Sequence, residues 1–221
     1  MPKNHLKRIA APHSWKIKRK KHIWVIRAKG PHKLENSIPL AVLLRDILKH
    51  AKTMKEVKDI INNKVILVNG KRRKDPHFGI GIMDIVEIPE VKEKYIILID
   101  KLGKIIALKT NLNSRISKII NKKRIGKRTQ LNLFGGENFI VEKDNYKTGD
   151  SVIIDNKKIK EHLKFEEGAN CFLTGGSHKG EFGNVSKIEK DSVFVKIDNS
   201  EFETKKDFIY IIGKEKIVVE K

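Results

Sequence analysis

The side chains in this sequence that could do chemistry are mainly cations. Residues 1–36 contain eleven Lys or Arg and no acid before Glu35, and residues 101–136 contain ten more with no acid at all. Lys and Arg at this density bind phosphates and release the cations condensed on a polyanion. The two stretches therefore predict two surfaces for a polyanionic partner, with a merely solvated face as the alternative for the second.

Motifs for nucleotide binding or catalysis are not evident. Gly175–Gly180 is Gly-rich, but it lacks the hydroxyl residue of a P-loop, and strand-like segments follow it. Acids such as Asp144, Glu166 and Glu167 lie in predicted turns or beside Lys and do not suggest a pair for acid–base chemistry. We expect no enzyme activity and no cofactor.

Metal and thiol chemistry are not expected either. The eight His show no HxH or HxxxH spacing and Cys171 is the single Cys, so neither a zinc site nor a disulfide is predicted. Cys171 lies in an apolar run and should be a small core residue. Four His in the basic first segment are expected to hydrogen-bond phosphate or ribose: His5, His13, His22 and His32.

The overall charge agrees with a polyanionic partner. The formal net charge is +21, and residues 1–136 hold 33 of the 48 Lys and Arg but 10 of the 27 acids. Lys outnumbers Arg by 39 to 9, which favours mobile phosphate contacts over planar forks that read base edges. Pro12 interrupts any signal-peptide core, and runs such as Tyr95–Ile99 are too short to cross a bilayer. The sequence predicts a soluble, cytosolic protein.

The elements that must position these cations fall into four segments, of which residues 1–36 form a basic arm. Such an arm cannot bury a core of its own. Trp15 and Trp24 are candidate anchors that stack on base faces or dock on the neighbouring domain. The alternative is a disordered tail whose Trp side chains pack on the protein.

Residues 37–90 should form two helices and a hairpin. A helix from Pro39 has Leu and Ile at helical spacing, and a second begins with the capping box Thr53–Glu56. The strand Val65–Val68 precedes Asn69-Gly70, a dipeptide favoured in tight hairpins, and then a run of cations.

The remaining chain should be mainly strands. Met83–Ile88 alternates like a half-buried strand, and residues 91–167 should form a small barrel or sandwich. Residues 168–221, near-neutral in charge, should form a small all-strand unit. Other expected strands are Tyr95–Ile99, Lys104–Leu108, Val152–Ile154, Asn170–Leu173, Ser192–Ile197 and Phe208–Ile212, with a turn over Thr174–Gly183.

Taken together, the residues resemble the "four-e" protein family of the archaeal and eukaryotic small ribosomal subunit, over nearly the whole chain. The similarity rests on these motifs in this order: His5-Leu6-Lys7-Arg8, Ala11-Pro12 with Trp15, Gly30-Pro31-His32, Ile38-Pro39-Leu40, Leu44-Arg45-Asp46, Val68-Asn69-Gly70-Lys71, Gly81-Ile82-Met83-Asp84-Ile85, Leu131-Asn132-Leu133, Thr148-Gly149-Asp150, Thr174-Gly175-Gly176 and Phe208-Ile209-Tyr210-Ile211-Ile212-Gly213. The short segment after Gly213 resembles archaeal members.

The resemblance implies an α+β, multi-domain fold. Its parts are a basic N-terminal arm (1–36), a small helix-helix-hairpin alpha-L RNA-binding domain (37–90), a central mainly β domain (91–167) and a C-terminal KOW-type, SH3-like β barrel (168–221). It also implies a structural constituent of the small ribosomal subunit that binds ribosomal RNA and neighbouring ribosomal proteins, with no membrane or small-molecule partner. Ser177 and Glu181 stand where the family has basic residues, so packing or protein contact is expected of that turn.

The residues predicted to contact RNA are Lys7, Arg8, Trp15, Lys16, Lys18, Arg19, Lys20, Lys21, Trp24, Arg27, His32, Lys33, Arg45, Lys52, Lys55, Lys71, Arg72, Arg73, Lys122, Lys123, Arg124, Lys127 and Arg128. Two other functions are open at this point. The first is an RNA-modifying enzyme, because alpha-L motifs are also appended to pseudouridine synthases. The second is a free translation factor that binds the ribosome in less than stoichiometric amounts.

Overall fold

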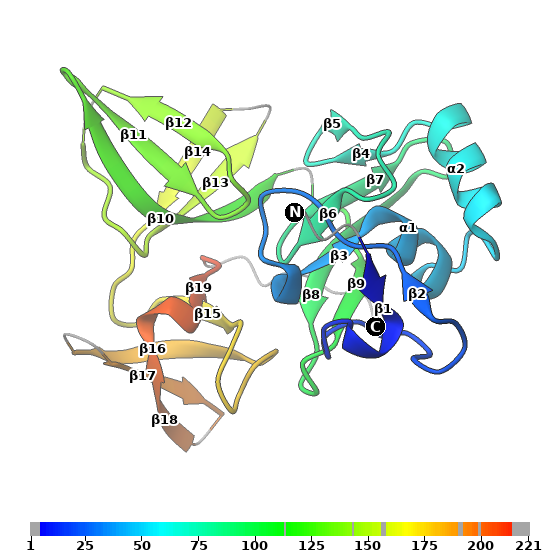
Figure 1. Ribbon diagram of the computed structural model, residues 1–221. Helices are drawn as coiled ribbons and strands as arrows, with labels where there is room; N and C mark the ends of the chain where they lie inside the picture. The colour runs from blue at the N-terminus through cyan, green and yellow to red at the C-terminus, as the bar shows by residue number, and fades with distance from the viewer. Residues whose placement is uncertain are drawn as a thin grey trace. The chain divides into compact units, whose positions relative to one another are not determined.

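The computed structural model of the protein describes residues 5–112, 114–142, 144–155, 158–189, 192–198 and 200–213. The described chain divides into two compact units, the first made of residues 5–99 and 103–112 and the second of residues 100–102 and 114–213 (Figure 1). Both units are mostly β, with few helices. The first contains one five-stranded antiparallel sheet, and the second contains two. The prediction of a multi-domain protein rich in short strands is confirmed at this level.

The first unit combines short helical segments with three small sheets. Its elements are β1 (Leu6–Lys7), η1 (Arg8–Ala10), β2 (Trp24–Val25), η2 (Leu34–Asn36), β3 (Ser37–Pro39), α1 (Leu40–Val42), η3 (Leu43–Ile47), α2 (Met54–Asn63), β4 (Leu67–Val68), β5 (Lys71–Arg72), β6 (Gly79–Gly81), β7 (Ile85–Ile88), β8 (Glu93–Ile99) and β9 (Ile105–Lys109). The main sheet has the order β5-β4-β7-β8-β9, and β1-β2 and β3-β6 form separate pairs.

The two predicted helices of this unit are present. The first is α-helical only over α1, and η3 continues it as a π-helical turn in which the Leu48 amide donates to the Leu43 carbonyl. The second, α2, has the predicted capping box, because the Glu56 amide donates to the Thr53 hydroxyl and the Lys52 amide donates to the Glu56 carboxylate. Val57 and Ile61 bury its apolar face.

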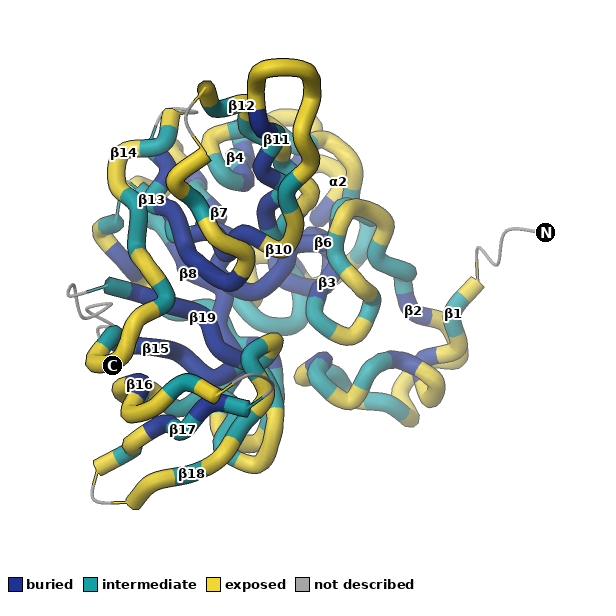
Figure 2. The backbone as a smooth tube through the Cα atoms, turned by 90° about the vertical axis from the view of Figure 1, so that its left-hand side faces the viewer, coloured by how far each residue is buried: buried dark blue, intermediate teal, exposed yellow. Residues whose placement is uncertain are grey.

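Strands β8 and β9 lie in the same sheet as β4 and β7, which differs from the expected boundary at residue 90. The reason is that β7 and β8 form a tight hairpin, closed by the Lys92 amide donating to the Pro89 carbonyl. The strand predicted within residues 83–88 is present as β7, but the expectation that it is half-buried was wrong. Strand β7 lies between β4 and β8 in the sheet, and Ile85, Val86 and Ile88, whose side chains alternate between its two faces, are all buried (Figure 2).

The second unit contains two five-stranded antiparallel sheets. Its elements are β10 (Arg115–Ile125), β11 (Arg128–Leu133), β12 (Asn138–Val141), β13 (Ser151–Asp155), β14 (Lys158–Leu163), β15 (Asn170–Leu173), β16 (Phe182–Ile188), β17 (Ser192–Ile197), β18 (Ser200–Lys205), η4 (Lys206–Phe208) and β19 (Ile209–Ile211). The sheet orders are β12-β11-β10-β13-β14 and β18-β17-β16-β15-β19. Each sheet has its own apolar cluster, around Leu131 and Val152 in the first and Val193 and Cys171 in the second.

Candidate nucleic-acid interface

Part of the described basic arm packs on the rest of the first unit, with Arg8, Ala11, Trp15 and Val25 buried. Trp15 is 1% exposed, and its indole N–H donates to the Ser37 carbonyl at 2.6 Å. The neighbouring Ser14 carbonyl accepts from the Ile105 amide at 2.7 Å, which ties the arm to β9. Of the two expected roles for Trp15, the structure therefore gives docking on the neighbouring domain, because a buried ring cannot stack on a base.

Several predicted contact residues use their polar groups in hydrogen bonds within the protein. Arg8 is 3% exposed, and its Nε donates to the Lys18 carbonyl at 2.6 Å. Arg19 donates to the carbonyls of Ile9, Ala11 and Pro12 at 2.7–3.0 Å. The two guanidinium groups hold the loop between β1 and β2 in shape.

This loop and its flanks carry the exposed cations of the arm. The group that we call the arm surface consists of the exposed residues Lys7, Lys16, Lys18, Lys20, Lys21, Trp24 and Lys33. Trp24 is 53% exposed, lies opposite Lys7 in the β1–β2 pair and contacts the His5 ring at a centroid distance of 5.5 Å. An exposed indole beside cations has the composition of a base-stacking platform.

The second group of cations belongs to the β4–β5 hairpin and to α2. Asn69 and Gly70 have φ values of 53° and 71°, as the predicted tight turn requires, and they bring Lys71 and Arg72 to its far side. Arg73 instead lies over the Phe78 ring at 4.1 Å. The exposed cations of this second group are Lys52, Lys55 and Arg72, and we name them the helix–turn surface; Lys71 is half-buried and has a partner of its own.

A buried carboxylate fixes the hairpin. Asp84 accepts from Asn69 Nδ2 at 2.7 Å and from the Gly81 amide at 2.7 Å, and it pairs with His32 Nε2 at 2.9 Å. Burial alone would raise the pKa of Asp84, but hydrogen bonds from His32, Asn69 and Gly81 lower it below its ordinary value. His32, a predicted RNA contact, is thus an internal partner of Asp84.

Gly81 is required at this point because a Cβ there would overlap the His32 ring. No local pattern indicates the Asp84 network, since its members come from distant segments of the chain.

Two other predicted RNA contacts also have partners within the protein. Arg45 donates to Asp46 at 2.7 Å. Arg27 is half-buried, and its carbonyl lies 3.2 Å from His77 Nδ1.

The third group lies on the β10–β11 hairpin. Its turn at Gly126, with φ 59°, brings together exposed side chains that we call the hairpin surface: Lys123, Arg124 and Lys127. Arg128 is exposed too, but it pairs with Glu142 at 3.7 Å. Lys122, the fifth residue predicted here, pairs with Asp144 at 2.8 Å. Ile125, 48% exposed, lies opposite Arg128.

The other cations of residues 101–136 do not join this surface. Arg115 is buried and pairs with Glu137, and Lys118 is buried with its Nζ donating to the carbonyls of Lys206, Asp207 and Ile209 at 2.8–3.1 Å. Lys109 pairs with Glu93, and Lys101 with Glu181. The cations of this run therefore do not form a single continuous surface.

Other chemistry finds little support in the described segments of the chain. They contain no group of three or more His, Cys, Asp or Glu that could hold a metal ion. Burial raises the pKa of the Cys171 thiol to about 12, and the residue is fully buried, so the prediction of a core Cys is confirmed. Over the same residues, no helix is long and apolar enough to span a membrane.

Comparison with known proteins adds an independent line of evidence. The RS4NT domain model matches residues 1–35, the S4 domain model residues 38–86, and the model of Ribosomal family S4e residues 91–160. The chain is 38% identical to the small ribosomal subunit protein eS4 of Methanococcus vannielii and to that of Methanocaldococcus jannaschii, over 99% of this chain and 97% of each relative. The crystal structure of the 30S ribosomal protein S4e from Thermoplasma acidophilum matches with a TM-score of 0.71 and 29% identity, over 80% of this chain and 95% of that one.

Proposed function

This chain belongs to the ribosomal S4e family, and we propose that it holds folded ribosomal RNA through the arm surface, the helix–turn surface and the hairpin surface. As a member of that family it is a structural component of the small ribosomal subunit in the cytoplasm, and not an enzyme. Its partners are ribosomal RNA, for which the S4 domain is suited, and neighbouring ribosomal proteins.

One observation carries the proposal for the three surfaces. When the cations that hydrogen-bond or pair within the protein are set aside, exposed predicted residues remain in three groups: on the arm, on α2 and its flank with the β4–β5 turn, and on the β10–β11 turn. Flexible Lys side chains on a fixed backbone suit contacts to phosphates whose positions are set by the RNA fold. Binding would then follow RNA shape more than base sequence.

The finer architecture belongs to the same proposal. We assign the alpha-L motif to α1–α2 with the β4–β5 hairpin, supported by the S4 domain match over residues 38–86. We assign the KOW-type barrel to β15–β19, supported by its five antiparallel strands and its separate apolar cluster. We also propose that the chain consists of four modules with boundaries near residues 36, 90 and 167, although the β7–β8 hairpin crosses the second boundary.

Salt dependence of RNA binding tests the proposal. The chain should bind purified small-subunit ribosomal RNA with an affinity that falls steeply as KCl is raised. Replacing Lys16, Lys18, Lys20 and Lys21 together by Ala should flatten the plot of log affinity against log salt by up to about 4, roughly one per lost phosphate contact. A slope equal to that of the wild type would exclude the arm surface from the interface.

Stoichiometry distinguishes a structural component from a transient factor. Small subunits from the source organism, washed in high salt, should contain close to one copy of this chain per particle by quantitative mass spectrometry. A count far below one after the wash would favour the free translation factor.

A further inference from the structure

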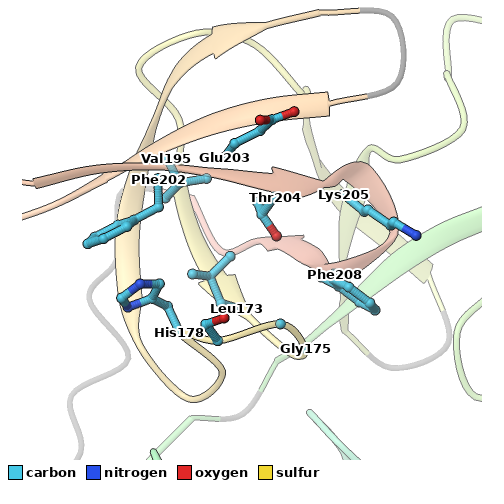
Figure 3. A pocket seen from close by; sticks show the side chains of 11 residues that line it. Leu173, Gly175, His178, Val195, Phe202, Glu203, Thr204, Lys205 and Phe208 are labelled. Carbon is cyan, nitrogen blue, oxygen red and sulfur yellow. The ribbon is translucent and has the colours of Figure 1, made fainter.

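The second sheet of the second unit contains a cavity that the three cationic surfaces do not use. It has a volume of about 300 Å³ and lies between the turn after β15 and the β18–η4 segment (Figure 3). Leu173 and Val195 contribute apolar lining, and the turn contributes Gly175 through His178. This turn includes Ser177, one of the positions where the sequence departs from the basic pattern of the family.

Flat rings line the two ends of this cavity. Figure 3 shows His178 and Phe202 at one end and Phe208 at the other. The His178 and Phe202 rings are nearly stacked, with centroids 3.7 Å apart and planes inclined by 33°. A Cβ on Gly175 would overlap the Phe208 ring, so the absence of a side chain there lets the ring take its place.

Glu181 and Lys101 orient the ring of His178. Its Nδ1 lies 3.0 Å from Glu181 Oε2, and Glu181 Oε1 pairs with Lys101 at 2.8 Å. Hydrogen bonds from Lys101 and His178 lower the pKa of Glu181, so this residue is an anionic orienter of the imidazole. Glu181 is the second position that departs from the basic pattern of the family, and here its carboxylate orients the His178 ring.

Several polar groups in the lining can form further hydrogen bonds. The Thr204 hydroxyl points between the two aromatic ends in Figure 3. Among the described residues, no acceptor is bound by the main-chain amides of Gly175, Gly176, Ser177 and His178. Lys205 is exposed at the rim. Consecutive free amides and an ammonium group favour an anionic group at the mouth.

We propose that this cavity binds one unpaired nucleobase of RNA, with its face against the aromatic rings, its edge at Thr204 and its phosphate near Lys205. The inference rests on the proposed function, because ribosomal RNA is the partner that brings unpaired bases to the chain. A volume at the low end of the range for ligand pockets, about 300–1,000 Å³, suits one base better than several residues of peptide. Unpaired bases splayed onto aromatic side chains are the usual targets of specific RNA recognition.

Titration of the full-length protein with each of the four ribonucleoside 5′-monophosphates tests the proposal. Main-chain amide signals of Gly175–His178 should shift saturably in NMR spectra with at least one nucleotide. The shifts should disappear in Thr204→Leu, which fills the cavity, and persist in Glu201→Leu, on the same strand but outside the lining. Retention of dispersed β15–β19 signals in both variants would show that they fold.

Three results would overturn the proposal. They are shifts confined to the arm, equal shifts with inorganic phosphate alone, and shifts caused by a proline-rich peptide but by no nucleotide, which would assign the cavity to a protein partner. Affinity for ribosomal RNA separates this failure from that of the proposed function. Thr204→Leu should weaken binding about tenfold, the size of one stacking contact, without changing the salt slope. Wild-type affinity in T204L with a normal slope would remove the base site and leave the three surfaces standing.

Discussion

At the scale of single residues, the two Trp side chains have opposite environments and should have opposite roles. Trp15 is buried and hydrogen-bonded, so Trp15→Ala should lower the free energy of unfolding by about 3–5 kcal/mol. Trp24 is exposed, so Trp24→Ala should leave stability nearly unchanged and weaken ribosomal RNA binding about tenfold through lost stacking. Urea unfolding and filter binding on both variants check this. Equal RNA affinity of W24A and wild type would leave Trp24 without a role in binding.

Asp84 gives a second prediction at this scale, through pH. Because its pKa is held below the ordinary value, the folded protein binds this proton less tightly than the unfolded chain. The resulting stabilisation is complete above the ordinary Asp pKa of about 3.9 and is lost as pH falls through the lower folded pKa.

Replacement of Asp84 by Asn should therefore cost about 3 kcal/mol at pH 7, the cost of breaking a buried pair, and much less in the acid range. Urea unfolding at a series of pH values measures the difference. Asp59→Asn, at an exposed position on α2, is the matched control and should show no such trend. A cost in D84N that stays constant down to the lowest pH would mean that shape, and not charge, is what the site requires.

At the scale of elements, Lys118 joins the two sheets of the second unit. It lies on β10 and donates to carbonyls of η4 and β19, while its own amide donates to the Tyr210 hydroxyl at 3.0 Å. Burial lowers the pKa of Lys118 to about 8, with Asp207 opposing the shift. The unfolded chain, with a Lys pKa of about 10.4, therefore holds this proton more tightly than the folded protein.

Since the unfolded state binds more protons between pH 8 and about 10.4, Lys118 should stabilise the fold increasingly as pH rises through that window. We expect the difference in unfolding free energy between wild type and Lys118→Met to move in favour of the wild type over this range, by up to about 3 kcal/mol. Lys123→Met, exposed on the same strand, should show a flat difference. A flat difference for K118M as well would mean that the ammonium is not desolvated.

The elements also show what could be predicted from the sequence. The capping box at Thr53 and the Asn69-Gly70 turn were predicted and confirmed, because in each the partners lie within a few residues of one another. His32 and Asp84, 52 residues apart, and Lys118 and Tyr210, 92 apart, leave no local pattern. The sequence likewise could not predict which cations are exposed and which are internal. Lys7 and Arg8 are adjacent in the same basic stretch, but Lys7 is exposed and Arg8 is buried.

At the scale of the whole molecule, the three surfaces should act on one RNA through linked contributions. Surfaces on one chain bind in succession, and the first contact raises the effective concentration of the others. Their counterion terms add, because each neutralised phosphate releases its own cations. Variants that remove Lys20 and Lys21, Lys55 and Arg72, or Arg124 and Lys127 should each flatten the salt slope by up to about 2, and the three combined by the sum.

The matched control uses cations that already have acidic partners. Lys109→Ala and Lys187→Ala remove as much formal charge as two surface residues, but these side chains pair with Glu93 and Glu189. They should change the slope little if contact, and not net charge, determines binding. If this pair flattened the slope as much as R124A/K127A, the large net charge would attract the RNA as a general field, and the three surfaces would not be its specific contacts.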